Sequence, residues 1–177
     1  RLRVALVAPG LGIAPEQVEV IIHPESLIHS MVGFHDGAIM AHMGAPDMRH
    51  SIGYALHWPD RAHLPVERLD LARVANLTFR APDLDRYPAL RLAREVMARR
   101  GLAGAAFNAA KEVALDWFLD GRIGFMRMAG VVEDTLTVLD GELGAGNLPG
   151  SLEDVLAMDH LARIRAGEQA RRIAGER

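Results

Sequence analysis

Two short apolar segments, residues 28–34 and 38–43, flank the tripeptide His35-Asp36-Gly37. Glycine supplies the positive φ that a tight turn needs, so this arrangement predicts an antiparallel β-hairpin. A β-branched segment, Val18–Ile22, predicts a further short strand before the hairpin. Simple alternation along the first hairpin strand predicts one face that carries Ser30, Val32 and Phe34, and an opposite face that carries His29, Met31 and Gly33.

The residues after the hairpin predict one helix and then a connector. Asp47 can cap a helix that runs to about His57, and Pro59 ends it because the residue before a proline resists the α conformation. Residues 61–84 contain prolines and show no firm periodicity, which indicates a connector between two parts of the chain.

From about residue 85 onward the apolar residues recur at a helical period. Pro88 suits a first helical turn, and Gly101 stops that helix. Gly141–Gly150 reads as a loop, after which Ser151 and Asp154 resemble a capping box. The predicted helices after the first cover residues 103–119, residues 126–139, and a last helix or broken pair of helices that Asp159 could restart. Short connections between helices favour antiparallel neighbours, so a small bundle is predicted.

The fold class predicted is therefore α+β, with a small mixed or antiparallel sheet and a helix followed by a C-terminal helical bundle. The corresponding division is residues 1–60, a connector at residues 61–84, and the bundle at residues 85–177.

Charge and composition exclude several classes of partner. A net charge of −3 gives no broad electrostatic attraction to nucleic acid or anionic membranes, and 5% aromatic residues are too few for base-stacking platforms. The apolar run at Val4–Ala8 is far shorter than a membrane span. The chain has no cysteine, which excludes disulfides and thiolate metal sites and is compatible with a reducing cytoplasm. We expect a cytoplasmic protein with no nucleic-acid or membrane partner.

Histidines are concentrated in the first part of the chain, where six of the eight lie between Glu19 and Arg61. His23, His29 and His42 could face one site, since imidazole is a general acid, base or metal ligand near neutral pH. No carboxylate stands at ligand spacing, however, and half-buried strand histidines with local partners are the simpler interpretation. The serines that flank His29 lack the surrounding motif of a hydrolase nucleophile. On the following helix, His50 and His57 are seven residues apart, which favours a solvated or interface face.

Two further segments are candidates for ligand contact. The loop Gly44–Met48 leaves a strand and enters a helix, which is a common location for ligand contacts and also for a purely structural cap. Asn108 lies in the middle of a predicted helix, where asparagine is a poor helix former. Its side chain is therefore expected to have a specific partner, either within the protein or on a ligand.

Taken together, several strings resemble the 1-deoxy-D-xylulose 5-phosphate reductoisomerase family. In the family's order, they are VEVIIHPESLIHSM, DGAIMAHMGAPDMR, HWPDR, LTFRAPDLDRYPALRLA, FNAAKEVALDWFLDGRIGF and SLEDVLAMD, across roughly residues 14–159. The resemblance implies an enzyme of isoprenoid biosynthesis that isomerises a sugar phosphate with Mn²⁺ or Mg²⁺ and reduces the product with NADPH. It also implies a homodimer, in which residues 1–60 are the end of a catalytic and dimerisation domain.

Carried over to this sequence, His29 matches an active-site histidine of the family. Pro46 and Met48 match residues that lie beside the substrate and the nicotinamide. Two positions depart from the family pattern: Lys111 replaces an asparagine, and Arg127 stands where many relatives have a helix-capping acid. We expect both departures to affect packing or caps.

The upstream motifs that the resemblance implies are not found in this sequence. They are a Gly-rich NADPH loop, an Asp-Ser-Glu metal motif, a Trp-containing flap, and a last metal carboxylate near the start, where residues 1–8 contain no acid. A hard cation needs carboxylate oxygens, so we expect this chain alone to hold neither NADPH nor the metal and to be inactive. The chain is interpreted as the C-terminal portion of a reductoisomerase. The alternative is a free-standing, non-catalytic dimerisation or binding module derived from that family.

Overall fold

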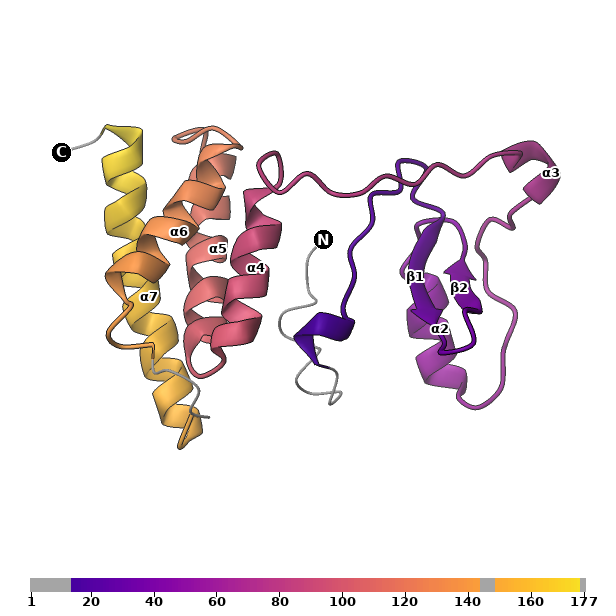
Figure 1. Ribbon diagram of the computed structural model, residues 1–177, viewed down its shortest axis with the longest axis horizontal. Helices are drawn as coiled ribbons and strands as arrows, with labels where there is room; N and C mark the ends of the chain where they lie inside the picture. Colours follow the sequence, from indigo (N-terminus) through magenta and orange to yellow (C-terminus); the bar gives the residue numbers. More distant parts are fainter. Residues whose placement is uncertain (1–13, 144–148, 176–177) are drawn as a thin grey trace. The chain divides into compact units, whose positions relative to one another are not determined.

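A computed structural model describes residues 14–143 and 149–175, and these residues form two compact units (Figure 1). One unit, residues 20–82, contains the hairpin and is called the strand unit. The other, residues 14–19 and 83–175, is called the helical unit. The α+β class predicted from the sequence is confirmed. The expectations for residues 1–12 and for the centre of the Gly141–Gly150 loop lie outside the described residues.

The predicted hairpin is present in the strand unit. Strands β1 (Ile28–Gly33) and β2 (Ile39–Met43) pair antiparallel. Gly37 closes the turn with a φ of 88°, and the Phe34 amide donates to the Ala38 carbonyl at 2.9 Å. Gly37 therefore adopts the positive φ that the sequence predicted for this turn.

Simple alternation fails at one point of β1. Ile28 faces Met43 and Ser30 faces His42, so the pairing shifts by one residue and His29 is the extra residue of a β-bulge. The prediction that Ser30 and His29 occupy opposite faces is wrong here, because the His29 ring lies 5.8 Å from the ring of His42, the cross-strand partner of Ser30. A bulge redirects side chains in this way and is frequent beside functional sites.

The segment Val18–Ile22 does not form the predicted strand. Val18 packs instead against the core of the helical unit, and Ile22 makes only an isolated antiparallel bridge with Arg80. The bridge at Ile22 does not extend into a ladder, because the chain passes from the helical unit into the strand unit after Glu19.

Two helices follow the hairpin: α2 (Arg49–His57) and α3 (Leu71–Val74). Helix α2 begins two residues after Asp47, whose carboxylate accepts from the Arg49 amide at 2.9 Å. Residues 61–82, interpreted from the sequence as part of a connector, pack within the strand unit, where Leu64 lies against Gly53 of α2.

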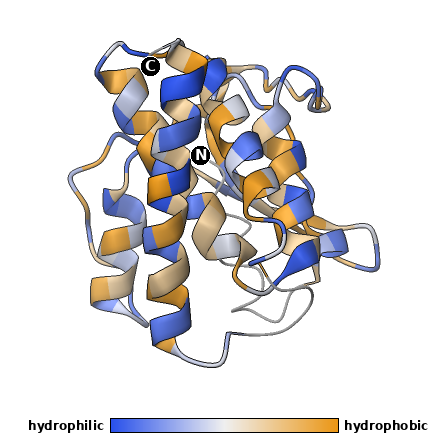
Figure 2. Cartoon of the chain, turned by 90° about the vertical axis from the view of Figure 1, so that its left-hand side faces the viewer, coloured by the Kyte–Doolittle hydropathy of each residue, from blue (hydrophilic) through white to orange (hydrophobic). Residues whose placement is uncertain are grey.

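The helical unit contains a short 3₁₀ turn, η2 (Pro15–Gln17), and four longer helices. These are α4 (Pro88–Arg99), α5 (Ala103–Leu119), α6 (Arg127–Val138) and α7 (Leu152–Ala174). All the fully buried apolar side chains of the described residues lie in this unit, between Leu90 and Ala170. Figure 2 shows hydrophobic and hydrophilic residues interspersed along these helices, as expected for helices that bury one face.

Helix α7 is one continuous helix and not the broken pair that was considered. Ser151 accepts from the Asp154 amide and Asp154 accepts from the Ser151 amide, which makes the predicted capping box. The helix ends at Gly175 in the left-handed conformation, with φ of 77°. Asp159 starts no new helix, because its carboxylate instead binds Arg163 one turn later. Among the described helices, none is both long enough and apolar enough to cross a membrane.

Candidate functional site

The loop from Gly44 to Met48 connects β2 to α2 and is held from several sides. The Gly44 amide donates to the Leu27 carbonyl at 3.0 Å, and the Asp47 amide donates to the Ala45 carbonyl at 2.7 Å. His29 Nε2 lies 3.3 Å from the same Ala45 carbonyl oxygen. The bulged histidine of β1 therefore contacts the loop that carries Pro46 and Met48.

Pro46 and Met48 are both exposed on this loop, with Met48 61% exposed. The rigid ring of Pro46 and the flexible thioether of Met48 lie at the end of a strand, where they are accessible to a ligand.

Asp47 and Arg49 close the loop with an ion pair. The Arg49 Nε donates to the Asp47 Oδ2 at 2.9 Å, and the Arg49 amide donates to the Asp47 Oδ1 at 2.9 Å. The hydrogen bonds from the Arg49 side chain, followed by the one from its amide, lower the pKa of Asp47 to about 2. The carboxylate is therefore ionised over the physiological range, and the pair is formed throughout it.

Two further histidines, His42 and His50, have rings close to His29 or to the loop. The His42 ring is the nearest ring to His29 and meets the His50 ring edge-on at 6.2 Å. His50 Nε2 is buried without a hydrogen-bond partner in the described part of the chain. It lies so close to Gly44 that a β-carbon at that position would come within 3.1 Å of Nε2. Of the solvated or interface face expected for His50 and His57, the solvated alternative does not describe His50, which is half-buried.

The three histidines that could have faced one site do not converge, and His23 has the local partners of the simpler interpretation. His29 and His42 are neighbours, but His23 stacks on Phe79 at 4.8 Å. His23 Nδ1 lies 2.9 Å from the Thr78 carbonyl and 3.0 Å from the Glu25 carboxylate. His23 therefore connects the segment before β1 to residues 78–79 of the strand unit. His50 was missed as a site neighbour, because only the close passage of α2 behind Gly44 brings it there.

No three His, Asp or Glu side chains within residues 14–143 and 149–175 are placed to hold a metal ion. The divalent cation implied by the resemblance does not fit the described residues.

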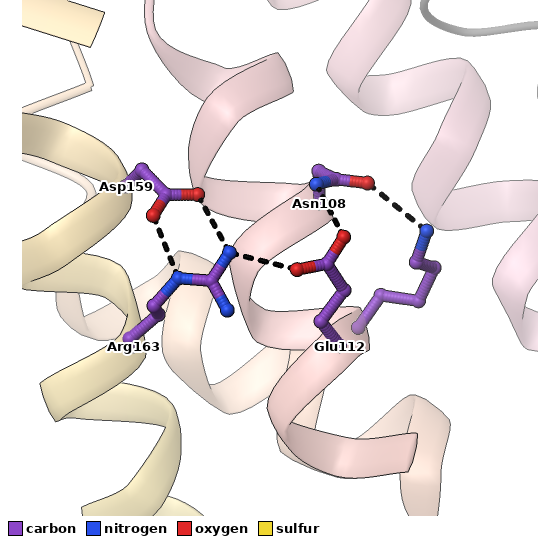
Figure 3. Close-up of polar contacts among 5 residues, drawn as sticks. Asn108, Glu112, Asp159 and Arg163 are labelled. Atoms are coloured by element: carbon purple, nitrogen blue, oxygen red, sulfur yellow. Dashed lines mark hydrogen bonds and ion pairs between the residues drawn. The ribbon is translucent and has the colours of Figure 1, made fainter. Parts of the chain in front are cut away.

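The conspicuous polar network of the helical unit lies where α5 meets α7 (Figure 3). Arg163 donates to Glu112 at 2.7 Å and to Asp159 at 2.6 Å. Asn108 donates to Glu112 at 3.0 Å and accepts from Lys111 at 3.0 Å. Arg163, and then Asn108, lower the pKa of Glu112. The mid-helix asparagine thus has the specific partner that the sequence predicted, and Lys111, which was expected to affect packing or caps, donates to it.

A β-hairpin with an exposed loop, followed by a compact bundle of four helices, defines a small protein of the α+β class. Residues 43–165 match the family model described as "DXP reductoisomerase C-terminal domain", and the chain belongs to that family.

Related proteins agree with this assignment. The chain is 61% identical over 159 residues to 1-deoxy-D-xylulose 5-phosphate reductoisomerase of Cereibacter sphaeroides, covering 90% of this chain and 40% of the relative. It is also 61% identical over 164 residues to the enzyme of that name from Ruegeria pomeroyi, covering 93% of this chain and 42% of the relative. The chain spans about two fifths of the length of these relatives.

Solved structures show the same likeness. The reductoisomerase of Zymomonas mobilis in complex with NADPH superimposes with a TM-score of 0.81 at 45% identity, covering 92% of this chain and 42% of that one. A DOX-P reductoisomerase in complex with NADPH, fosmidomycin and magnesium gives a TM-score of 0.86 at 33% identity, covering 96% of this chain and 43% of that one.

Proposed function

We propose that this chain is the C-terminal portion of a reductoisomerase that converts 1-deoxy-D-xylulose 5-phosphate to 2-C-methyl-D-erythritol 4-phosphate. In this proposal, residues 1–60 end the catalytic domain, residues 61–84 connect, and residues 85–177 form the C-terminal bundle. The single observation that carries the proposal is the agreement of fold and sequence with relatives of that name over nine tenths of this chain.

The contribution of this chain is one wall of the site, formed by His29, Pro46 and Met48. A carbonyl oxygen only accepts, so the contact of His29 Nε2 with the Ala45 carbonyl requires the proton on Nε2. Nδ1 is then left as an acceptor that can receive a hydroxyl proton of the sugar phosphate or orient that hydroxyl. NADPH, when bound, supplies the hydride. Pro46 and Met48 provide the apolar surface on which its nicotinamide ring is oriented and water is excluded.

The metal and most of the NADPH contacts belong to the remainder of such an enzyme. The described residues offer no metal site, so Mn²⁺ or Mg²⁺ is proposed only for the parent protein. Removing the metal by chelation is accordingly expected to leave the thermal unfolding of this chain unchanged.

The decisive experiment is a chimera. The C-terminal two fifths of the Cereibacter sphaeroides enzyme would be replaced by residues 14–177 of this chain, and NADPH oxidation would be measured with 1-deoxy-D-xylulose 5-phosphate and Mn²⁺. The chimera should turn over, its His29→Ala variant should lose about 10²-fold in rate, and the separate 177-residue chain should show no turnover. A folded but inactive chimera would favour the non-catalytic module derived from the same family.

We also propose that the strand unit mediates a homodimer in the cytoplasm. Val32, Phe34 and Met40 lie on one face of the hairpin and are each at least 48% exposed, and exposed apolar clusters mark interaction surfaces. Met40→Lys should reduce the mass measured by light scattering at high concentration. Leu119→Lys, an equally exposed site in the helical unit, is the matched control. A chain that is monomeric at all concentrations would contradict this proposal.

A further inference from the structure

The loop that carries Pro46 and Met48 lies against imidazole rings from three successive elements. His29 of β1 contacts its Ala45 carbonyl, His50 of α2 lies against Gly44, and the ring of His42 of β2 neighbours the rings of both. His42 lies between the other two rings, at 5.8 and 6.2 Å between ring centroids. His42 and His50 have no role in the function proposed above.

We propose that His42 and His50 are positioning residues that hold the Gly44–Met48 loop in the conformation that receives the nicotinamide end of NADPH. This inference rests on the proposed function for the identity of the ligand. The coupling of the rings to the loop is independent of that identity and can be tested separately.

The contact of His50 with Gly44 carries the argument. Nε2 is buried and lies against a residue that has no side chain. The Gly44 amide is already used by the Leu27 carbonyl, so it cannot donate to this nitrogen. The ring therefore supports the loop by contact, and a β-carbon at residue 44 would require the ring to move by a few tenths of an ångström.

The same contact makes the loop sensitive to the protonation of His50. The neutral ring with its proton on Nδ1 presents only a lone pair to Gly44. A protonated ring presents an N–H donor for which the described residues offer no acceptor, and a buried donor without a partner is costly. The ring or the loop must then move until Nε2 reaches water or an acceptor.

The charged groups around His50 act in opposite directions. Asp47, just before α2, attracts an imidazolium, and His50 in turn contributes to the low pKa of Asp47. Arg49 of α2 and the imidazoles of His42 and His29 oppose a further positive charge when they are protonated. Protonation of the His50 ring is therefore expected to displace the loop.

The test uses the whole 177-residue chain with ¹³C-labelled methionine methyl groups, followed by NMR from pH 8 to pH 5 without NADPH. The Met48 methyl resonance should move with pH in the wild type. In His50→Gln that movement should be lost, and in His42→Gln it should be reduced. His160→Gln, at an exposed position of α7, should leave it unchanged. The buried Met158 methyl group reports that each variant is folded.

A second variant covers the case in which His50→Gln does not fold. Gly44→Ala places a methyl group 3.1 Å from His50 Nε2, so it should displace the ring and shift the Met48 resonance at constant pH. The proposal is overturned if Met48 does not respond to pH in the wild type, or if it responds equally in His50→Gln.

In the active chimera, His50→Gln should raise the KM for NADPH severalfold at nearly constant kcat, because a displaced loop weakens binding without touching the reacting atoms. An unchanged KM would overturn the role in receiving NADPH. An inactive chimera would instead contradict the proposed function and leave the methyl resonances to decide whether the rings position the loop.

Discussion

At the scale of single residues, three different types of contact hold the Gly44–Met48 loop. Asp47 and Arg49 form an exposed ion pair within three residues of chain, His29 reaches the loop by a long polar contact, and His50 supports it by packing. Sequence reasoning proposed His29, Pro46 and Met48 as site residues through resemblance. It missed the bulge that turns His29 toward His42, because simple alternation gives no sign of where a strand gains an extra residue.

The Asp47–Arg49 pair gives a prediction with a defined pH range. The pKa of Asp47 is lowered from 3.8 to about 2 in the folded chain. A lowered pKa means that ionisation favours the folded state above about pH 4, and that this contribution is lost as the pH falls through about 2. Asp47→Asn should therefore be less stable than the wild type at pH 7, and the two should converge near pH 2.

Thermal unfolding at pH 7, 4 and 2 measures this difference. The control is Asp36→Asn, whose carboxylate accepts only from a backbone amide in the hairpin turn. Because the Asp47 pair is exposed to solvent, salt should shrink the difference at pH 7. A constant difference at all three pH values would contradict the assignment.

At the scale of elements, the helices were better predicted than the strands. Pro88, Gly101, Ser151 and Asp154 act where the sequence placed them, since caps and breakers depend on neighbours within four residues. Val18–Ile22 failed as a strand because pairing depends on a distant partner, and only Arg80 provides a bridge. The continuity of α7 across Asp159 was likewise undetermined, because an aspartate can cap a new helix or bind an arginine one turn ahead.

The capping box of α7 can be tested directly. Ser151→Ala removes the side-chain acceptor for the Asp154 amide and should lower the free energy of unfolding of the helical unit by about 1 kcal/mol. Ser151→Gly should cost only about a few tenths of that. Urea unfolding followed by circular dichroism distinguishes them, and equal losses would mean that the side-chain bond does not stabilise the helix.

Alanines set the close packing of α7 in the helical unit. Ala162, Ala166 and Ala170 are each 0% exposed, so there is no room for a larger side chain. Ala166→Leu should destabilise the unit by about 1–3 kcal/mol through overpacking. Ala157→Leu, at an exposed position of the same helix, should change the stability by less than about 0.5 kcal/mol. Similar effects at both positions would contradict this account of the core.

At the scale of the whole molecule, the two units differ in how much apolar surface they bury. Every fully buried apolar side chain of the described residues lies in the helical unit, whereas the hairpin exposes most of its side chains. Burial of apolar surface supplies most of the folding free energy. The two units should therefore differ in their free energy of unfolding. The sequence suggested the boundary between them, but it could not show that residues 14–19 belong with the bundle.

Hydrogen exchange followed by NMR measures the stability of each unit. Amides of β1 and β2 in the separate chain should exchange through openings of lower free energy than amides in the middle of α5. Residue Ile22, bridged to Arg80, should group with the strands, and amides of α7 should group with α5. A single free energy for all of these amides would show that the two units unfold together.

The packing of η2 and Val18 on the helical unit has a consequence for synthesis of the chain. These residues leave the ribosome before the strand unit, yet their partner α4 begins at Pro88. The strand unit is therefore an insertion whose two ends return to one body. The bundle cannot be completed in the order in which it is translated, and its first segment must wait for more than sixty intervening residues, Val20–Pro82, before it can dock.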